Sequence, residues 1–176
     1  SSLAHLDHQE NKHDDAVERL KQATEVSWDS GELVEWYRAA ISLLRIYLQR
    51  RGLTSQLKSF MEKLVSFELS GYSVEEKFEV MLGRAELLSL LAQAYYEEGN
   101  HTEAKKILQL LREMAVSSQN PILTSIIFQT LGWYYLKTGN LGEAMKLLNV
   151  AKDSLAISGE NYNSAGNLLN LGLLYE

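Results

Sequence analysis

The stretch that decides the fold occurs twice in the chain, at a fixed separation. Residues 91–104 read LAQAYYEEGNHTEA, and residues 131–144 read LGWYYLKTGNLGEA. The second copy begins 40 residues after the first, and residues 171–176, LGLLYE, match the start of the same pattern another 40 residues on. A fixed period with matched residue types indicates a repeat architecture, in which each repeat is one supersecondary unit.

Each repeat reads as a helix, a tight turn and a second helix. In the first helix an apolar quartet is spaced i, i+3, i+4 and i+7, which predicts one buried face. The quartets are Leu88, Leu91, Ala92 and Tyr95; Phe128, Leu131, Gly132 and Tyr135; and Leu168, Leu171, Gly172 and Tyr175. The third member of each quartet is small, so we expect a neighbouring helix to approach closely there. Ala104, Leu108, Ala144 and Leu148 predict the matching face of the second helices.

The turns carry the residues that end one helix and start the next. They read Glu-Gly-Asn at 98–100 and Thr-Gly-Asn at 138–140. Glycine accepts the left-handed backbone that ends a helix, and asparagine caps the helix that follows. Four further signals predict helix starts: Asn100 with Glu103, Asn140 with Glu143, Ser73 with Glu76, and Asn120 before Pro121.

These residues resemble the tetratricopeptide repeat family. The resemblance is carried by the Leu-Gly…Tyr quartet, the Gly-Asn turn, the Glu-Ala that follows it, and the later Leu148 and Ala151. It covers residues 86–176 and is degenerate over residues 1–70. The usual period of that family is about 34 residues, so a period of 40 is similar to its long-repeat branch.

The upstream part fits the same scheme less closely. Leu3, Ala4, Ala16, Leu20 and Ala23 predict a degenerate hairpin with its turn at Asn11-Lys12, and residues 41–64 predict another. An insertion is expected around residues 69–80. The predicted fold is all-α: a superhelical solenoid of about nine antiparallel helices in four and a half hairpins. We expect one repeat domain, part of a longer protein, with units 1–29, 31–70, 74–118, 121–158 and an incomplete 161–176.

The resemblance implies a concave groove, lined by the first helices, that binds a peptide or helix of another protein. It assigns to this groove the residues that lie off the apolar quartets. These are Gln93, Tyr96, Glu97, Gln129, Trp133, Leu136, Lys137, Asn167, Asn170 and Leu173, with Ser89 as a further candidate.

Two of these assignments have a competing structural interpretation. Trp133 either contacts a partner, as tryptophan does at binding hot spots, or packs against a neighbouring helix, since tryptophan is mostly buried. Asn167 and Asn170 share a helix face, and asparagines near this place in the long-repeat branch hold partner backbone. Their alternative is a bond to water or to the neighbouring helix.

Composition excludes several classes of function. The net charge is −6 and the pI is about 5.3, which disfavours nucleic-acid and anionic-membrane surfaces. There is no cysteine, so neither a disulfide framework nor Cys-ligated zinc can form. No apolar run is long enough to span a membrane. We expect a cytoplasmic protein, with the nucleus as a second possibility.

No motif for catalysis or for a cofactor is present. The chain has no zinc-protease helix, phosphate-binding glycine loop, dinucleotide fingerprint or nucleophile elbow. His5, His8 and His13 lie near acidic residues, but a solvated surface is favoured over a metal site because the ligand set is incomplete. His101 is expected in a turn. The residues that would clamp a chaperone's terminal carboxylate are absent, since their places hold Ser89, Gln93, Gln129 and Trp133.

The sequence therefore favours a non-catalytic interaction scaffold or adaptor without cofactor or metal. The alternative is a sensor solenoid of a larger regulator, such as a transcription regulator, that responds to a ligand or peptide. An enzyme is disfavoured because no polar groups converge. Self-association is also possible, through the apolar face of Leu168, Leu171 and Tyr175 in the incomplete last unit.

Overall fold

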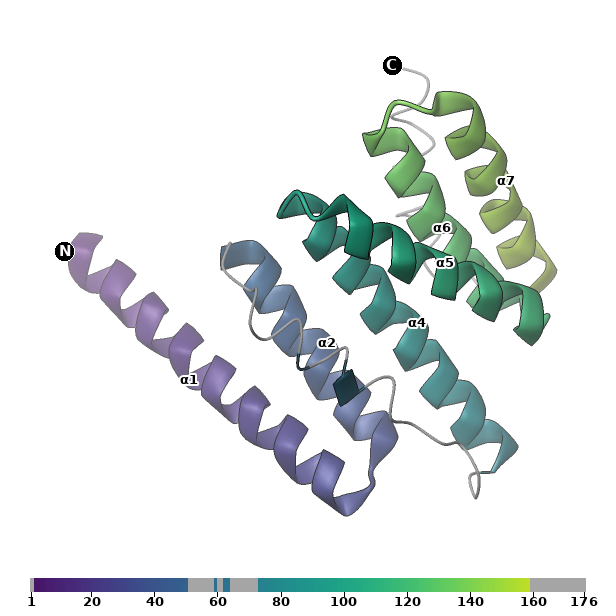
Figure 1. Ribbon diagram of the computed structural model, residues 1–176. Helices are drawn as coiled ribbons and strands as arrows, with labels where there is room; N and C mark the ends of the chain where they lie inside the picture. The colour runs from purple at the N-terminus through teal and green to yellow at the C-terminus, as the bar shows by residue number, and fades with distance from the viewer. Residues whose placement is uncertain (1, 51–58, 60–61, 64–72, 159–176) are drawn as a thin grey trace. The chain divides into compact units, whose positions relative to one another are not determined.

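A computed structural model describes residues 2–50, 59, 62–63 and 73–158, and over these residues the regular structure is entirely helical (Figure 1). The helices are α1 (Ser2–Ser30), α2 (Leu33–Arg50), α4 (Val74–Glu97), α5 (His101–Ser118), α6 (Pro121–Lys137) and α7 (Leu141–Ser158). The predicted all-α class is confirmed. The chain divides into two compact units, Ser1–Leu87 and Leu88–Glu176.

The predicted count of about nine helices is not supported, because the described residues contain six. One difference lies at Asn11-Lys12, where a turn was predicted and α1 continues unbroken from Ser2 to Ser30. Neither residue forces a break: without glycine or proline, a continuous ladder of backbone hydrogen bonds is available. The helices predicted within residues 51–72 and 161–176 lie outside the described residues.

Three of the connections close on a glycine with positive φ: Gly31 (+76°), Gly99 (+80°) and Gly139 (+78°). At the second, the Gly99 N–H donates to the Tyr96 carbonyl (2.9 Å) and the Asn100 N–H to the Tyr95 carbonyl (2.8 Å). This pair of bonds satisfies carbonyls that the end of a helix leaves without partners. The same pair recurs at the others: Gly31 to Trp28 and Glu32 to Ser27, then Gly139 to Leu136 and Asn140 to Tyr135.

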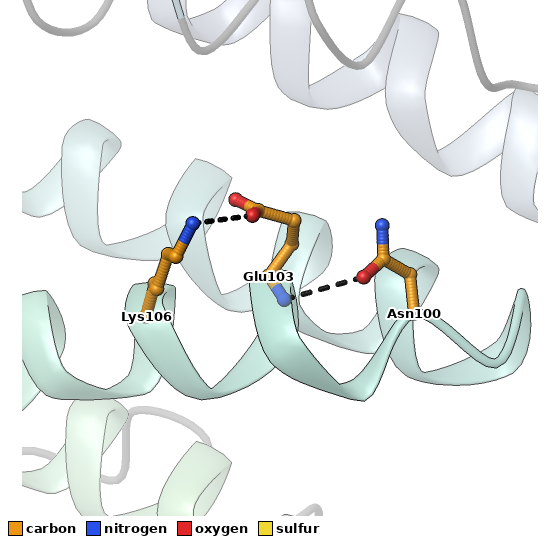
Figure 2. Close-up of polar contacts among 3 residues, drawn as sticks. All are labelled: Asn100, Glu103 and Lys106. Carbon is orange, nitrogen blue, oxygen red and sulfur yellow. Dashed lines mark hydrogen bonds and ion pairs between the residues drawn. The ribbon is translucent and has the colours of Figure 1, made fainter.

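Asn100 closes one helix and starts the next. Its backbone N–H is used by α4, while its side-chain Oδ1 accepts a hydrogen bond from the Glu103 N–H (3.3 Å; Figure 2). In a full capping box, the Glu103 carboxylate would bond the Asn100 N–H. Because that N–H is already engaged, the carboxylate instead pairs with Lys106 Nζ at 2.6 Å. The start of α7 repeats the arrangement, with Glu143 N–H on Asn140 Oδ1 at 3.3 Å.

The start of α4 shows the complete capping box. The Ser73 N–H donates to Glu76 Oε2 (2.8 Å), and the Glu76 N–H donates to Ser73 Oγ (3.2 Å). Hydrogen bonding of the Glu76 carboxylate by the backbone and side chain of Ser73 lowers the pKa of Glu76. Asn120 caps α6 by accepting from the Ile122 and Leu123 N–H groups, with Pro121 in the first turn. The four predicted helix starts are therefore confirmed.

In the first unit, α1 and α2 pack side by side as an antiparallel pair (Figure 1). Their contact is aromatic: the Trp36 ring lies 5.5 Å from Trp28 and 4.8 Å from Tyr37, measured between centroids. Tyr37 is 1% exposed and packs against Gly83 of α4, where an added Cβ would lie 2.7 Å from Tyr37 Cβ. Because Gly83 has no side chain, the α4 backbone can lie directly against the Tyr37 side chain of α2.

In the second unit, α6 packs along α7 and against α5. Leu131 and Gly132 of the predicted quartet are buried, and Leu148 of α7 fills the space beside Gly132. A Cβ on Gly132 would lie 2.6 Å from Leu148 Cγ, so the predicted close approach is confirmed. The expected second-helix residues are buried as well: Ala104, Leu108, Ala144 and Leu148. Tyr95, Phe128 and Tyr135 are only half-buried.

Gly132→Ala is expected to lower the free energy of unfolding by about 1 kcal/mol, measured by urea denaturation. Alanine favours a helix over glycine by about 1 kcal/mol, but overpacking a close contact costs about 1–3 kcal/mol. The new methyl group meets Leu148 Cγ, a branch point rather than the free end of a side chain.

Gly142→Ala is the matched control for this change. It is the same substitution in the first turn of α7, where the added Cβ meets nothing within 4 Å. A gain of about 0.5 kcal/mol is expected there. Stabilisation by both substitutions would contradict a tight α6–α7 contact.

Tyr37→Phe is expected to raise the free energy of unfolding at pH 7 by about 1 kcal/mol, because the Tyr37 hydroxyl is buried without a hydrogen-bond partner in the described part of the chain. Burial raises the pKa of Tyr37 from 10.0 to about 12, while the nearby Arg84 guanidinium acts in the opposite direction. The folded state thus holds the proton more tightly, and this contribution is lost as the pH rises from 10 towards 12.

Thermal melts from pH 8 to 12 check this sign. The stability of the parent should fall more steeply above pH 10 than that of Tyr37→Phe, so that the variant's advantage grows. A loss of stability at pH 7 in the variant would show that the hydroxyl is satisfied.

Candidate partner-binding surface

The last turns of α4 and α6 bring the predicted groove residues of two successive repeats together. Tyr96 of α4 and Trp133 of α6 stack edge to face, with ring centroids 5.4 Å apart at 77°. Their helices are held in register by a buried polar contact, since Thr130 Oγ1 lies 2.8 Å from Ser89 Oγ. Ser89 was predicted to face the groove; it is 6% exposed, because its hydroxyl is used between the two helices.

Tyr96 also bonds the end of the next repeat's first helix. Its hydroxyl donates to the Lys137 carbonyl at 3.0 Å. Lys137 is the last residue of α6, so its carbonyl has no partner within the helix. Tyr96 therefore has a structural role: its ring supports Trp133 and its hydroxyl caps α6.

Further aromatic rings surround Tyr96. Its ring centroid lies 5.0 Å from that of His101 and 5.8 Å from that of Tyr134, and Tyr134 lies 5.7 Å from Tyr135. We call Tyr96, His101, Trp133, Tyr134 and Tyr135 the aromatic cluster. His101 was expected in a turn but is the first residue of α5, exposed and against Tyr96.

Sequence reasoning missed Tyr134 as a member of this site. It lies outside the apolar quartet, yet it is 7% exposed, and burial raises its pKa, with Tyr135 and Tyr96 acting in the same direction. The signal was its place directly before Tyr135, the last member of the quartet: neighbouring helix residues lie about 100° apart, so a broad apolar face can include both rings.

The described groove candidates fall into two classes of exposure. Two of them, Glu97 and Lys137 on the last turns of α4 and α6, are exposed. The other five are half-buried: Gln93, Tyr96, Gln129, Trp133 and Leu136. Gln129 Nε2 donates to Ser125 Oγ at 3.3 Å on its own helix. Asn167, Asn170 and Leu173 lie outside the described residues, as do Leu168, Leu171 and Tyr175 of the self-association prediction.

The sequence leaves two interpretations of Trp133 open, contact with a partner and packing against a neighbouring helix, and the structure is compatible with both. Part of its ring packs on Tyr96, and part of its surface remains accessible. Packing of the ring against Tyr96 of α4 is therefore established. Contact with a partner stays a prediction.

The chemistry of the described residues is that of a surface rather than of a metal centre. Among residues whose side chains are described, no three His, Cys, Asp or Glu side chains group closely enough to hold a metal ion. The side chains of His5, His8 and His13 lie outside that part. No described helix has both the length and the apolar character needed to cross a membrane.

Tyr96→Phe is expected to lower the free energy of unfolding by about 0.5–1 kcal/mol, because the α6 carbonyl loses its hydrogen bond at a solvent-accessible place. The fluorescence of Trp133 should also shift, as its support loosens. The change is measured by urea denaturation followed through tryptophan emission.

Tyr95→Phe is the matched control, one residue away. Tyr95 is half-buried, and its hydroxyl makes no hydrogen bond within the described part of the chain. Its substitution should leave both the stability and the emission close to those of the parent. Equal effects of the two variants would mean that the Tyr96–Lys137 bond contributes nothing.

Comparison with known families agrees with this geometry. Residues 83–156 match the tetratricopeptide repeat model, a span that runs from Gly83 in α4 to Ala156 in α7. No curated protein and no solved structure matches the chain. The long-repeat branch and the degenerate upstream repeats stay predictions. Residues 83–156, which form most of the two hairpins α4–α5 and α6–α7, are therefore assigned to the tetratricopeptide repeat family.

Proposed function

We propose that this chain is a non-catalytic scaffold that binds a peptide or helix of another protein on the surface around Trp133. Tetratricopeptide repeats generally mediate protein–protein interactions. The surface is formed by the last turns of α4 and α6, and its described members are Gln93, Tyr96, Glu97, Gln129, Trp133, Leu136 and Lys137.

The observation that carries the proposal is that Trp133 is accessible and held in place. Its ring stacks on Tyr96, and Tyr96 is itself fixed by its bond to the Lys137 carbonyl. An aromatic side chain whose orientation is set before binding loses little conformational entropy when a partner covers it. Tryptophans in such surroundings are enriched among the residues that dominate binding energy.

The last residues of α4 and α6 carry opposite charges. Glu97 and Lys137 occupy equivalent positions in successive repeats, 40 residues apart, and both are exposed. A bound segment therefore meets a negative charge from one repeat and a positive charge from the next. Such a pattern selects the orientation of a partner whose own charges are reversed.

Affinity capture with the chain as bait tests the proposal. The Trp133→Ala/Lys137→Glu double variant removes the ring and reverses the charge at the end of α6. We expect a partner that the parent retains to bind the double variant at least 20-fold more weakly, since loss of a hot-spot residue costs about 2 kcal/mol or more. Affinity is measured by biolayer interferometry on the recovered partner.

Two control variants separate contact from folding. Trp133→Phe keeps an aromatic ring on Tyr96 and should retain most of the affinity. Lys152→Glu reverses an exposed charge on α7, away from this surface, and should bind like the parent. Circular dichroism checks that all variants keep their helicity. Equal binding by the double variant and the parent, or no partner at all, would refute the proposal.

A further inference from the structure

A second feature of the second unit lies between α5 and α6. It is an open hollow of about 440 Å³, lined by Lys105, Leu108, Gln109, Arg112, Leu131, Tyr134 and Tyr135. Trp133 does not line it. We call it the basic hollow.

The inner lining of the basic hollow is apolar and aromatic. Leu108 and Leu131 are 6% and 2% exposed, and Tyr134 is 7% exposed, so these side chains are fixed by the core behind them. Tyr135 is half-buried beside them. A small apolar side chain that entered here would exchange water for contact with rigid apolar atoms.

The rim is basic, and its charges are not neutralised. Lys105 and Arg112 are seven residues apart on one face of α5, about 10 Å along the helix. Neither forms an ion pair within the described part of the chain. Lys106, by contrast, pairs with Glu103 at 2.6 Å. Glu113, beside Arg112 in sequence, accepts a hydrogen bond from Gln109 Nε2 at 3.0 Å instead.

The chain as a whole is acidic. Its net charge is −6, so its summed field opposes the approach of an acidic partner. Here two cations that form no ion pair within the described residues lie beside an apolar floor, and complementary charge of this kind steers where an acidic segment docks. Lys137 and Lys152 are also exposed, but they do not line the hollow.

We propose that the basic hollow binds an acidic segment of another protein, in which two carboxylates about 10 Å apart flank an apolar side chain. The carboxylates pair with Lys105 and Arg112, and the apolar side chain lies on Leu108 and Leu131. In a polyproline II segment, which has three residues per turn, residues three apart lie on the same face about 9 Å from each other. The expected pattern is therefore two acidic residues separated by two residues, of which at least one is apolar. The hollow adjoins the surface around Trp133 through Tyr134 and Tyr135, but Trp133 itself does not line it.

Selection of a random peptide library on the whole chain tests this inference. The enriched peptide is synthesised with a fluorescein label, and its affinity is measured by fluorescence anisotropy at low and high salt. We expect enrichment of two acidic residues three apart, affinity that falls with salt, and at least tenfold weaker binding to Lys105→Glu and to Arg112→Glu. Arg112 is half-buried, so reversing its charge could disturb folding. Arg112→Gln only removes the charge and serves as a second variant at this position.

Lys152→Glu is the matched control, because Lys152 occupies in α7 the position that Arg112 occupies in α5, 40 residues earlier. It should bind the peptide as the parent does, and so should Trp133→Ala. Peptides without an acidic pair, equal binding by Lys105→Glu and Lys152→Glu, or no selected peptide would overturn the inference. Loss of binding in Trp133→Ala alone would overturn it while leaving the proposed function standing.

Discussion

The described hairpins depend on one backbone constraint. Between the two helices of each hairpin, one residue must adopt the left-handed backbone conformation, with positive φ. Gly31, Gly99 and Gly139 meet it with φ between +76° and +80°. The hydrogen bonds across each turn also use the backbone N–H of the residue after the glycine. That N–H is then not available to a side chain of the next helix. At Asn100 only the side chain is left to cap α5, so the Glu103 carboxylate turns to Lys106. At Ser73, whose backbone N–H bonds the Glu76 carboxylate, both halves of the capping box form.

A second constraint is the distance between helices. Small residues set it at two places, Gly83 against Tyr37 in the first unit and Gly132 against Leu148 in the second. At both, the larger partner fills the space that the glycine leaves, so backbone proximity and side-chain packing are met together. Close approach also leaves polar groups between helices without water. Ser89 and Thr130 satisfy each other there, whereas the Tyr37 hydroxyl has no partner within the described residues.

The features that could be read from the sequence are those that depend on local chemistry. Glycine turns, asparagine caps and apolar quartets each follow from a few neighbouring residues. The turns at Gly99 and Gly139 and the caps at Asn100, Asn120 and Asn140 lie where expected. Of the two quartets within the described residues, Leu88, Leu91, Ala92, Leu131 and Gly132 are buried and the aromatic members are half-buried. The turn at Asn11-Lys12 was wrong because a repeat pattern was extended to residues with no breaker of their own. Ser89 was placed on the surface because its partner lies 41 residues away, on a different helix.

The candidate site was predictable only in outline. Periodicity placed Tyr96 and Trp133 on equivalent faces, but their stacking depends on how far apart α4 and α6 lie. The basic hollow could not have been found at all, since it joins one face of α5 to one face of α6 and matches no motif.

Two side-chain bonds reach from one repeat to the next, Thr130 to Ser89 and Tyr96 to Lys137, and each spans 41 residues. In a solenoid, the interface between neighbours decides whether repeats melt one by one or together. If the hairpin of α4 and α5 opens, α6 loses its terminal hydrogen bond, and Trp133 loses the ring on which it rests. The surface around Trp133 then exists only while both hairpins are folded. A ligand held there would couple their unfolding, so that two repeats behave as a single cooperative element.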